Sequence, residues 1–381
     1  MVDDNGAEAR FWQEIEQAGA PLVEASGGDY LTTFLWRGEG RTTSVLVMSS
    51  LTFANEPREL MMERLSGTDV WYRTYKFPPG TAIVYELSPD SSGKASNGDP
   101  PADFASRFRR DPLNQQNLTG PMGGSYVVLP GSDGHRWSDE AADIPIETVS
   151  IKSAALNDKK KIMIYRPESP SMDRCWNLLV MFDGEWAVEQ MRTPLILRRL
   201  LGANEIPPTA AIFVMQENRS AELLGNEDFV RFVAKDVVGW ARRALPICED
   251  RGSAIVGGAS AGGLAAALTV LRHPDTFGGA LMLSSSLRWA PPGDTEPEWM
   301  ARQWSTVERS DVRIALSVGR HETVVPQGDN QVSLVVANRH FRDVLRARGA
   351  DVRMVLYEGA HEPLSWRGAI PDALRWLSNT R

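Results

Sequence analysis

Hydrophobic and polar residues are arranged in two different ways along the chain, and the change falls after about residue 130. From Phe11 to Leu129, after a short opening helix, the apolar runs are brief, rich in β-branched and aromatic residues, and separated by Gly, Pro, Asn and Asp. The clearest runs read DYLTTFLWRG, TTSVLVMSS, DVWYRTYKF and TAIVYELSP. Such runs are typical of antiparallel strands, so this region predicts an all-β, immunoglobulin-like sandwich whose Trp and Tyr residues serve chiefly as core.

After Glu147, longer apolar runs alternate with amphipathic stretches. The apolar runs include WNLLVMFDG, SAIVGGAS, RIALSVG and VRMVLYEGAH, and the amphipathic stretches include DFVRFVAKDVVGWARRAL. Continuous apolar strands between amphipathic helices predict a parallel sheet covered on both faces, the doubly wound α/β class. We therefore divide the chain into a β domain over residues 1–130, a polar linker over 131–146 and an α/β domain over 147–381.

Composition narrows the class of protein. Of the 381 residues, 42% are hydrophobic and 24% are charged, as in soluble globular proteins, and 41 basic against 49 acidic residues give a net charge of −8. Because this charge provides no field that would gather nucleic acid or anionic lipid, neither nucleic acid nor a membrane is predicted as a partner. The N-terminus does not read as a secretory signal, and no run reaches the about 20 apolar residues of a membrane span. We expect a soluble, cytoplasmic protein.

The two cysteines, Cys175 and Cys248, show no spacing typical of a metal site. One pair in so long a chain is not a disulfide framework, so a reducing compartment is expected. Neither a metal nor a cofactor is predicted, and the oligomeric state is left open.

The strongest local signal for chemistry is the run GASAG, with Ser260 at its centre. It follows the predicted strand SAIV and leads into the helical run GLAAALTVLRHP. A nucleophile elbow needs small residues on both sides of its serine, because the turn is strained and neighbouring backbone passes close by. The helix also directs its positive end at the serine, where negative charge develops during acyl transfer. The context predicts an α/β-hydrolase with Ser260 as nucleophile.

A serine nucleophile requires a base, and His361 lies where this fold carries one, after the last strong strand. The third member should be a carboxylate after the preceding strand, RIALSVG, where it can orient the imidazole. Glu322 is the first choice, and Asp329, in the same predicted loop, is the alternative. A Ser-His pair without a carboxylate also stays open.

Two backbone N–H groups should stabilise the oxyanion. We expect one from Ala261, the residue after the nucleophile, and the other from Glu185 in the loop after the strand WNLLVMF. The carboxylates of Asp183 and Glu185 could then orient a basic group, although Asp-Gly also serves in a simple turn.

Taken together, these segments resemble the enterochelin (enterobactin) esterase family, hydrolases that open the trilactone of catecholate siderophores. In the first domain the similar segments are FLWRG, LSGTDVWYRTYKFPPG and DPLN. In the second they are FDGEWA, NRSAELLGNEDF, GASAGGLAAAL, HPDTFGGALMLSSSLRW, GRHE and GAHEPLSWRGAIPDAL. The resemblance implies that Ser260 and His361 are catalytic, that Glu322 holds the acidic position, and that Arg219 and Asn226 belong to the segment lining the substrate site.

The chain departs from this family in two places. Where the family usually has an aromatic residue after the serine, this chain has Ala261, and a later aromatic stretch is reduced to Leu287-Arg288-Trp289. These departures leave the particular siderophore open. A ferric catecholate is strongly anionic, so cationic and aromatic groups should receive it. The candidates, expected on loops at the ends of strands, are Arg219, Arg288, Trp289, Trp366 and Arg367.

The sequence therefore predicts a serine esterase that cleaves the ester bonds of a catecholate siderophore, with iron entering only as part of the substrate. A second hypothesis is an esterase or acyltransferase of the same fold that acts on another, feruloyl-like ester, because one scaffold hosts many acyl-transfer chemistries. A third is a non-catalytic binding protein. An intact Ser260, His361 and Glu322 argue against the third.

Overall fold

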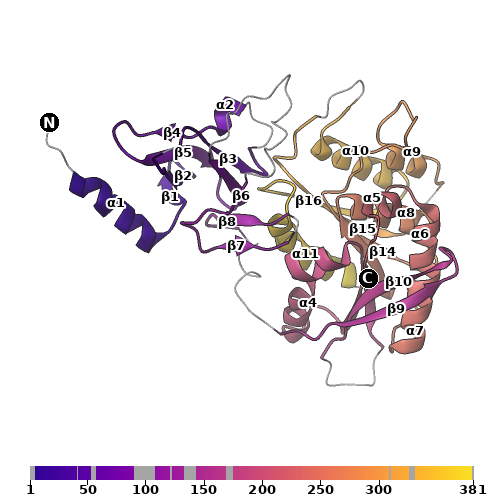
Figure 1. Cartoon of the computed structure of the whole chain (residues 1–381). Helices are drawn as coiled ribbons and strands as arrows, with labels where there is room; N and C mark the ends of the chain where they lie inside the picture. Colours follow the sequence, from indigo (N-terminus) through magenta and orange to yellow (C-terminus); the bar gives the residue numbers. More distant parts are fainter. Residues whose placement is uncertain are drawn as a thin grey trace. The chain divides into compact units, whose positions relative to one another are not determined.

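The computed structural model describes residues 5–40, 42–52, 57–89, 108–120, 122–132, 143–168, 175–308, 310–325 and 331–379. The chain forms two compact units, residues 1–133 and 134–381 (Figure 1). Each has its own hydrophobic core.

The first unit is built on two four-stranded antiparallel sheets, with strand orders β1-β2-β5-β4 and β3-β6-β8-β7. Its helices are α1 (Asn5–Ala18) and α2 (Pro57–Leu60), and its strands are β1 (Leu22–Ser26), β2 (Asp29–Arg37), β3 (Val45–Ser49), β4 (Glu63–Arg64), β5 (Val70–Phe77), β6 (Ala82–Pro89), β7 (Asn117–Leu118) and β8 (Gly124–Val128). Inward residues of both sheets, among them Phe34, Trp71, Val47 and Tyr85, share one core. The predicted all-β sandwich is confirmed.

The second unit is built on an eight-stranded sheet in the order β16-β15-β14-β13-β11-β12-β10-β9. The strands are β9 (Glu147–Ser153), β10 (Asp158–Tyr165), β11 (Asn177–Met181), β12 (Thr209–Val214), β13 (Ala254–Ala259), β14 (Gly279–Leu283), β15 (Arg313–Gly319) and β16 (Asp351–Tyr357). Strands β11 to β16 are mutually parallel, whereas β9 and β10 form an antiparallel hairpin at one edge.

Helices cover both faces of this sheet. They are α4 (Thr193–Gly202), α5 (Arg219–Leu223), α6 (Glu227–Arg231), α7 (Val238–Ala244), α8 (Ala261–Arg272), α9 (Trp299–Ser305), α10 (Leu334–Ala347) and α11 (Pro363–Ser378). Helix α8 packs on β13 and β14, and α11 packs on β14 and β15 beside α4. A π-helical turn, η3 (Phe232–Val237), connects α6 to α7, so the predicted long helix is continuous. The doubly wound α/β prediction is confirmed.

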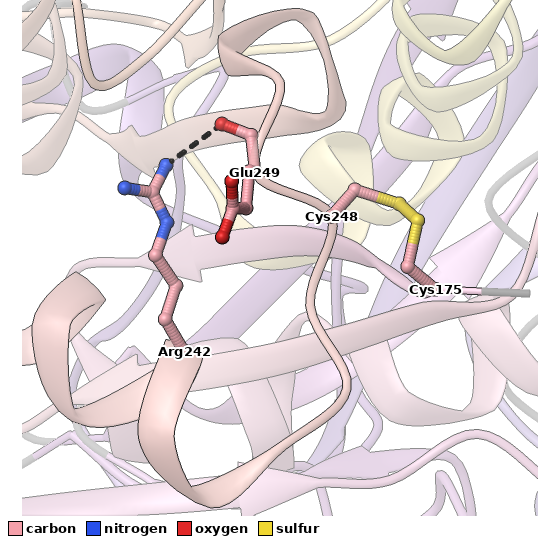
Figure 2. The surroundings of a disulfide bond; sticks show 4 residues. All are labelled: Cys175, Arg242, Cys248 and Glu249. Atoms are coloured by element: carbon pink, nitrogen blue, oxygen red, sulfur yellow. Dashed lines mark hydrogen bonds between the residues drawn. A yellow bond between two sulfur atoms is a disulfide. The ribbon is translucent and has the colours of Figure 1, made fainter.

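Cys175 and Cys248 form a disulfide bond, with their Cα atoms 4.9 Å apart (Figure 2). The expectation that they stay reduced is therefore wrong for this structure. Cys175 immediately precedes β11, and Cys248 leads to β13 through a short 3-10 turn, η4 (Arg251–Ser253). Because β11 and β13 are parallel neighbours, their amino ends lie at one edge of the sheet, and main-chain bonds between Trp176 and the 246–248 segment bring the two cysteines together.

Within the described part of the chain, none of the helices combines the length and the apolar character of a membrane span. The same residues contain no cluster of three or more His, Cys, Asp or Glu side chains that could hold a metal ion.

Candidate active site

The three predicted catalytic side chains follow neighbouring strands of the second unit. Ser260 follows β13, Glu322 lies just after β15, and His361 lies between β16 and α11. The serines 284–286, which were not predicted, follow the intervening strand β14. The carboxyl ends of parallel strands meet at the same edge of a sheet, which is where doubly wound folds bind ligands.

Ser260 occupies a strained turn between β13 and α8. Its backbone angles are φ 57° and ψ −118°, a conformation that costs free energy for any residue with a Cβ. The two neighbouring glycines permit the turn: a Cβ on Gly258 would lie 2.7 Å from the backbone of Gly262, and a Cβ on Gly262 would lie 3.1 Å from the carboxylate of Asp183. The strand, turn and helix thus form a nucleophile elbow.

The hydroxyl of Ser260 faces a second serine, which the sequence analysis did not single out. The Oγ atoms of Ser260 and Ser286 are 3.1 Å apart, and the Ser286 N–H donates to the carbonyl oxygen of Ser260 at 2.9 Å. Among the described residues, Ser286 is the hydrogen-bond partner of the Ser260 hydroxyl. Only its position after the neighbouring strand could have suggested this role, because no local motif marks it.

His361 is joined to Glu322. The Nδ1 atom of His361 lies 2.8 Å from Oε2 of Glu322, whose side chain is only 3% exposed. A carboxylate can only accept, so Nδ1 carries the proton and Nε2 is left as a base. The other oxygen of Glu322 accepts from the N–H of Gly319 at 2.8 Å and from Ser284 Oγ at 2.6 Å. Asp329, the alternative carboxylate, lies outside the described residues.

The two predicted oxyanion donors lie on adjoining segments. Ala261 is the first residue of α8, where backbone N–H groups have no partner within the helix. Glu185 immediately precedes a π-helical turn, η2 (Trp186–Gln190), and its side chain is exposed. The close approach of Asp183 to Gly262 brings this second segment beside the start of α8.

Arg219 is held by the same segment. Its Nε and Nη2 atoms donate to the two carboxylate oxygens of Asp183 at 2.6 and 2.8 Å, and its guanidinium stacks over the Trp186 ring at 4.7 Å. Burial raises the pKa of Asp183 above its ordinary value, and the ion pair with Arg219 opposes this shift. Asp183 therefore orients a basic group, as the sequence suggested for this segment.

A cavity of about 450 Å³ opens over Ser260. Two cations, Arg219 and Arg288, and one indole, Trp289, line it together with Ser286. The remaining lining residues are Ser220, Leu224, Ala261, Ala290, Asp294, Thr295, Glu296, Pro297 and Gln331. Burial lowers the pKa of Arg288, and the charge of Glu322 opposes the shift. The Trp289 ring meets that of Trp299 edge-on, with the centroids 5.5 Å apart.

Trp366 and Arg367 were expected on a loop, but both lie in helix α11. The side chain of Trp366 is fully buried and donates to Ser284 Oγ, while Arg367 is 4% exposed and donates to the main chain of Gln190. Neither side chain offers a surface to a substrate in this conformation. The expectation of a loop is wrong because α11 begins at Pro363, two residues after His361.

Asn226 caps helix α6 and does not line the cavity. Its side-chain oxygen accepts from the N–H of Phe229 at 2.9 Å, and its side-chain nitrogen donates to the carbonyl of Ala221 at 2.9 Å. Both ends of the amide are thus used in shaping the segment that carries Arg219.

Two family descriptions match the chain in the order of its two units. "Enterochelin esterase, N-terminal" matches residues 31–138, and "Putative esterase" matches residues 153–377. The iron(III) enterobactin esterase of Dickeya dadantii is 26% identical over 99% of this chain and 94% of its own length. The iron(III) salmochelin esterase of Escherichia coli is also 26% identical, over 96% of this chain and 93% of its own.

Solved structures share the fold of both units. The enterobactin esterase FES from Shigella flexneri, solved in the presence of enterobactin, gives a TM-score of 0.81 at 23% identity over 98% of both chains. The ferric enterobactin esterase of Salmonella typhimurium gives 0.78 at 23% identity over 97% of this chain and 98% of its own. At this identity the likeness supports the architecture and leaves the substrate to be argued from the site.

Proposed function

Since the chain belongs to the enterochelin esterase family and is a carboxylic ester hydrolase, we propose that it cleaves the ester bonds of a catecholate siderophore such as ferric enterobactin, so that the iron can be released inside the cell. The proposed substrate class is supported by the cavity over Ser260, whose lining includes two guanidinium groups and an indole. Ser260 is the nucleophile, His361 the general base, and Glu322 the carboxylate that orients it.

The first half of the reaction forms an acyl-enzyme. The hydroxyl of Ser260 leaves its contact with Ser286 and turns to Nε2 of His361, which takes the proton as the oxygen attacks the ester carbonyl. Catalytic hydrogen bonds are often made only once a substrate is bound, so this rotation is an ordinary step. Glu322 stabilises the imidazolium through its bond to Nδ1. The N–H groups of Ala261 and Glu185 receive the negative oxygen.

The second half releases the acid. The tetrahedral intermediate collapses, the ester C–O bond breaks, and the departing alcohol oxygen takes the proton from His361. Water then attacks the acyl-enzyme and gives one proton to His361. The second tetrahedral intermediate collapses, the bond between the acyl carbon and Ser260 Oγ breaks, and Oγ takes the proton back from His361 as the carboxylic acid leaves. One water is consumed for each ester bond broken.

Recognition in this proposal depends on charge and on flat rings. Catecholate oxygens are anionic, so Arg219 and Arg288 can bind them by charge-assisted hydrogen bonds, while Trp289 offers a face or edge to the catechol ring. Asp183 fixes the guanidinium of Arg219, which reduces the entropy lost on binding. The carboxylates of Asp294 and Glu296 also line the cavity, and Arg302 holds that of Asp294 at 2.6 Å.

The proposal is tested by comparing three esters: ferric enterobactin, iron-free enterobactin and a small neutral ester. We expect the wild type to prefer a catecholate, with mass spectra that contain linear or monomeric N-acyl amino acid products, and Ser260→Ala to be inactive on all three. Preference for the neutral ester would favour the second hypothesis, an esterase of another acyl class.

Arg288→Ala tests charge recognition separately. It should raise KM for the catecholate about ten-fold, because one charge-assisted bond is worth about 1.5–3 kcal/mol, and leave the neutral ester unchanged. Arg288 is preferred to Arg219, whose loss would leave Asp183 buried without its cation. Arg272→Ala is the matched control, since Arg272 pairs with Glu227 at the far end of α8. Equal effects of the two substitutions would contradict the proposed recognition.

The compartment is a separate part of the proposal. The sequence predicts the cytoplasm, and the Cys175–Cys248 disulfide removes the cysteine argument for it. Trapping thiols by alkylation at the moment of cell lysis tests this prediction. Two alkylated cysteines per chain would support a cytoplasmic location. A chain with no alkylated cysteine would support an oxidising compartment.

A further inference from the structure

Two hydroxyl groups from different elements contact the Oε1 atom of Glu322, the carboxylate oxygen that is not bonded to His361. Ser284 Oγ, after β14, lies 2.6 Å from Oε1, and the Tyr357 hydroxyl, at the end of β16, lies 3.2 Å from it. Tyr357 also lies 2.6 Å from Ser284 Oγ, and Nε1 of Trp366, in α11, donates to the same Oγ at 2.9 Å. The Ser284 side chain is therefore the centre of a buried network behind the carboxylate.

The direction of each hydrogen bond follows from the number of protons available. Trp366 Nε1 can only donate, and the ionised Glu322 can only accept. The single proton of Ser284 therefore goes to Glu322, which leaves Ser284 Oγ to accept from both Trp366 and Tyr357. Burial holds the pKa of Tyr357 well above its ordinary value, so its hydroxyl stays protonated and donates. Two donors aimed at one hydroxyl polarise it and strengthen its own bond to the carboxylate.

We infer that Ser284, Tyr357 and Trp366 are positioning residues that fix Oε1 of Glu322 and leave Oε2 to orient His361. The inference rests on the proposed function, in which Glu322 is the carboxylate of the triad. Trp366 contributes a second time, because its ring packs edge-on against that of His361 with the centroids 5.1 Å apart. The network thus holds both members of the Glu322–His361 pair, and it gives Trp366 a different role from the substrate contact expected from the sequence.

The network has a consequence for pH dependence. The ionisable groups that face this pair are Tyr357 from β16, Arg288 from the segment after β14, and Glu362, which acts on Tyr357 from the start of α11. Removing a donor from Oε1 leaves the carboxylate less stabilised, so it holds the proton of the His361 imidazolium more tightly. The acidic limb of the kcat/KM profile then moves to higher pH, a change that a loss of packing alone does not produce.

The experiment compares Tyr357→Phe and Ser284→Ala with the wild type, using a small neutral ester across a range of pH. Ser284→Ala removes the donor to Oε1 and should move the acidic limb upward by about 0.5–1 pH unit, since a hydrogen bond to a charged group is worth about one pKa unit or more. Tyr357→Phe removes the donor to Ser284 Oγ, so it weakens the bond from Ser284 to Glu322 and should move the limb in the same direction by a smaller amount. Ser284→Ala should also lower kcat about ten-fold with KM unchanged, because the orientation of His361 loosens without touching the cavity wall. Tyr357→Phe removes a single oxygen and serves if Ser284→Ala fails to fold.

Ser285→Ala is the matched control. Ser285 is the next residue, is fully buried, and its hydroxyl has no hydrogen-bond partner among the described residues, so the change should leave the profile where it is. Glu322→Gln separates the role of Glu322 in the triad from the positioning role of Ser284 and Tyr357. If Glu322→Gln loses most of its activity while the pH profiles of kcat/KM for Tyr357→Phe and Ser284→Ala match that of the wild type, the positioning role is contradicted and Glu322 keeps its role in the triad. If Glu322→Gln is as active as the wild type, the triad assignment fails and the positioning role with it.

Discussion

The absence of a side chain at Gly225 leaves room for Trp289, which lines the cavity. Gly225 has a φ of +73°, and a Cβ added to it would lie 2.8 Å from the ring of Trp289. The glycine therefore allows the chain to turn and allows the indole to lie against it. Trp289 is thus held by its contact with Gly225 and by its edge-on contact with Trp299.

Gly225→Ala should displace Trp289 and raise KM for a catecholate ester several-fold, while kcat for a small neutral ester changes little. The positive φ also costs about 1–2 kcal/mol of stability for a residue with a side chain. Gly293→Ala separates the two effects, because Gly293 has a φ of +87° with no atom within 4 Å of its added Cβ. The measurement is, for each variant, the ratio of KM for the catecholate ester to KM for the neutral ester. An unchanged ratio in Gly225→Ala would show that Trp289 does not contact the substrate.

Residues with a defined place in a strand order could be predicted from sequence, and residues that act through a buried partner could not. The small neighbours of Ser260 predict its place in a turn after a strand, and the strands that precede His361 and Glu322 predict the place of these two residues at the same edge of the sheet. Ser284 and Ser286 are members of a serine run in which nothing local distinguishes one hydroxyl from another. Their roles depend on which way each side chain points, and packing against β13 and β15 determines this.

At the scale of elements, the hydrophobic pattern predicts the strands with apolar runs and misses edge strands that are polar or very short. Strands β10 to β16 correspond to apolar runs, whereas β9 reads ETVSIKS and is largely exposed on one face. In the first unit, β4 and β7 have two residues each, too short for any alternation to register. Edge strands are stabilised by main-chain bonds to a neighbour, which a single sequence does not reveal.

The disulfide joins elements that sequence reasoning kept apart. Cys175 and Cys248 are 73 residues apart, and only the pairing of β11 with β13 makes them neighbours. A cross-link over a loop of this length is worth about 4 kcal/mol in the chain-entropy account. It lies at the amino edge of the sheet, whereas the catalytic groups lie at the carboxyl edge.

Reduction should therefore lower the melting temperature of the second unit by roughly 10 °C without lowering kcat at 25 °C. Differential scanning calorimetry and ester hydrolysis, each with and without dithiothreitol, test this. The double variant Cys175→Ser, Cys248→Ser should melt at the lower temperature in both conditions. A wild type whose melting temperature stays constant after its thiols have become titratable would contradict the expectation.

At the scale of the whole molecule, the protein is acidic while its proposed substrate is anionic. The net charge of −8 is spread over a surface of 18272 Å², whereas Arg219 and Arg288 line one small cavity. Charges separated by more than about 8 Å are largely screened at physiological ionic strength. Attraction within the cavity should thus outweigh repulsion by the distant surface.

Raising the salt concentration from about 0.05 to 0.5 M should therefore raise KM for a catecholate ester and leave a neutral ester unaffected. In Arg288→Ala this salt dependence should be weaker. A fall in the catecholate KM with salt would mean that the overall negative charge dominates, and that the two guanidinium groups do not receive the substrate.

The disulfide also determines how the protein responds to mechanical force. A chain pulled from its two ends extends along its covalent path, and the bond between Cys175 and Cys248 provides a shortcut across the 73 residues between them. In a single-molecule stretching trace, that span contributes nothing to the unfolded contour length until the bond is reduced, and then adds about 250 Å. The hidden segment contains β12, Arg219 and the Asp183–Glu185 loop but neither Ser260 nor His361. Under load, the oxidised chain can thus expose Ser260 and His361 while Arg219 and the Asp183–Glu185 loop remain inside a closed loop.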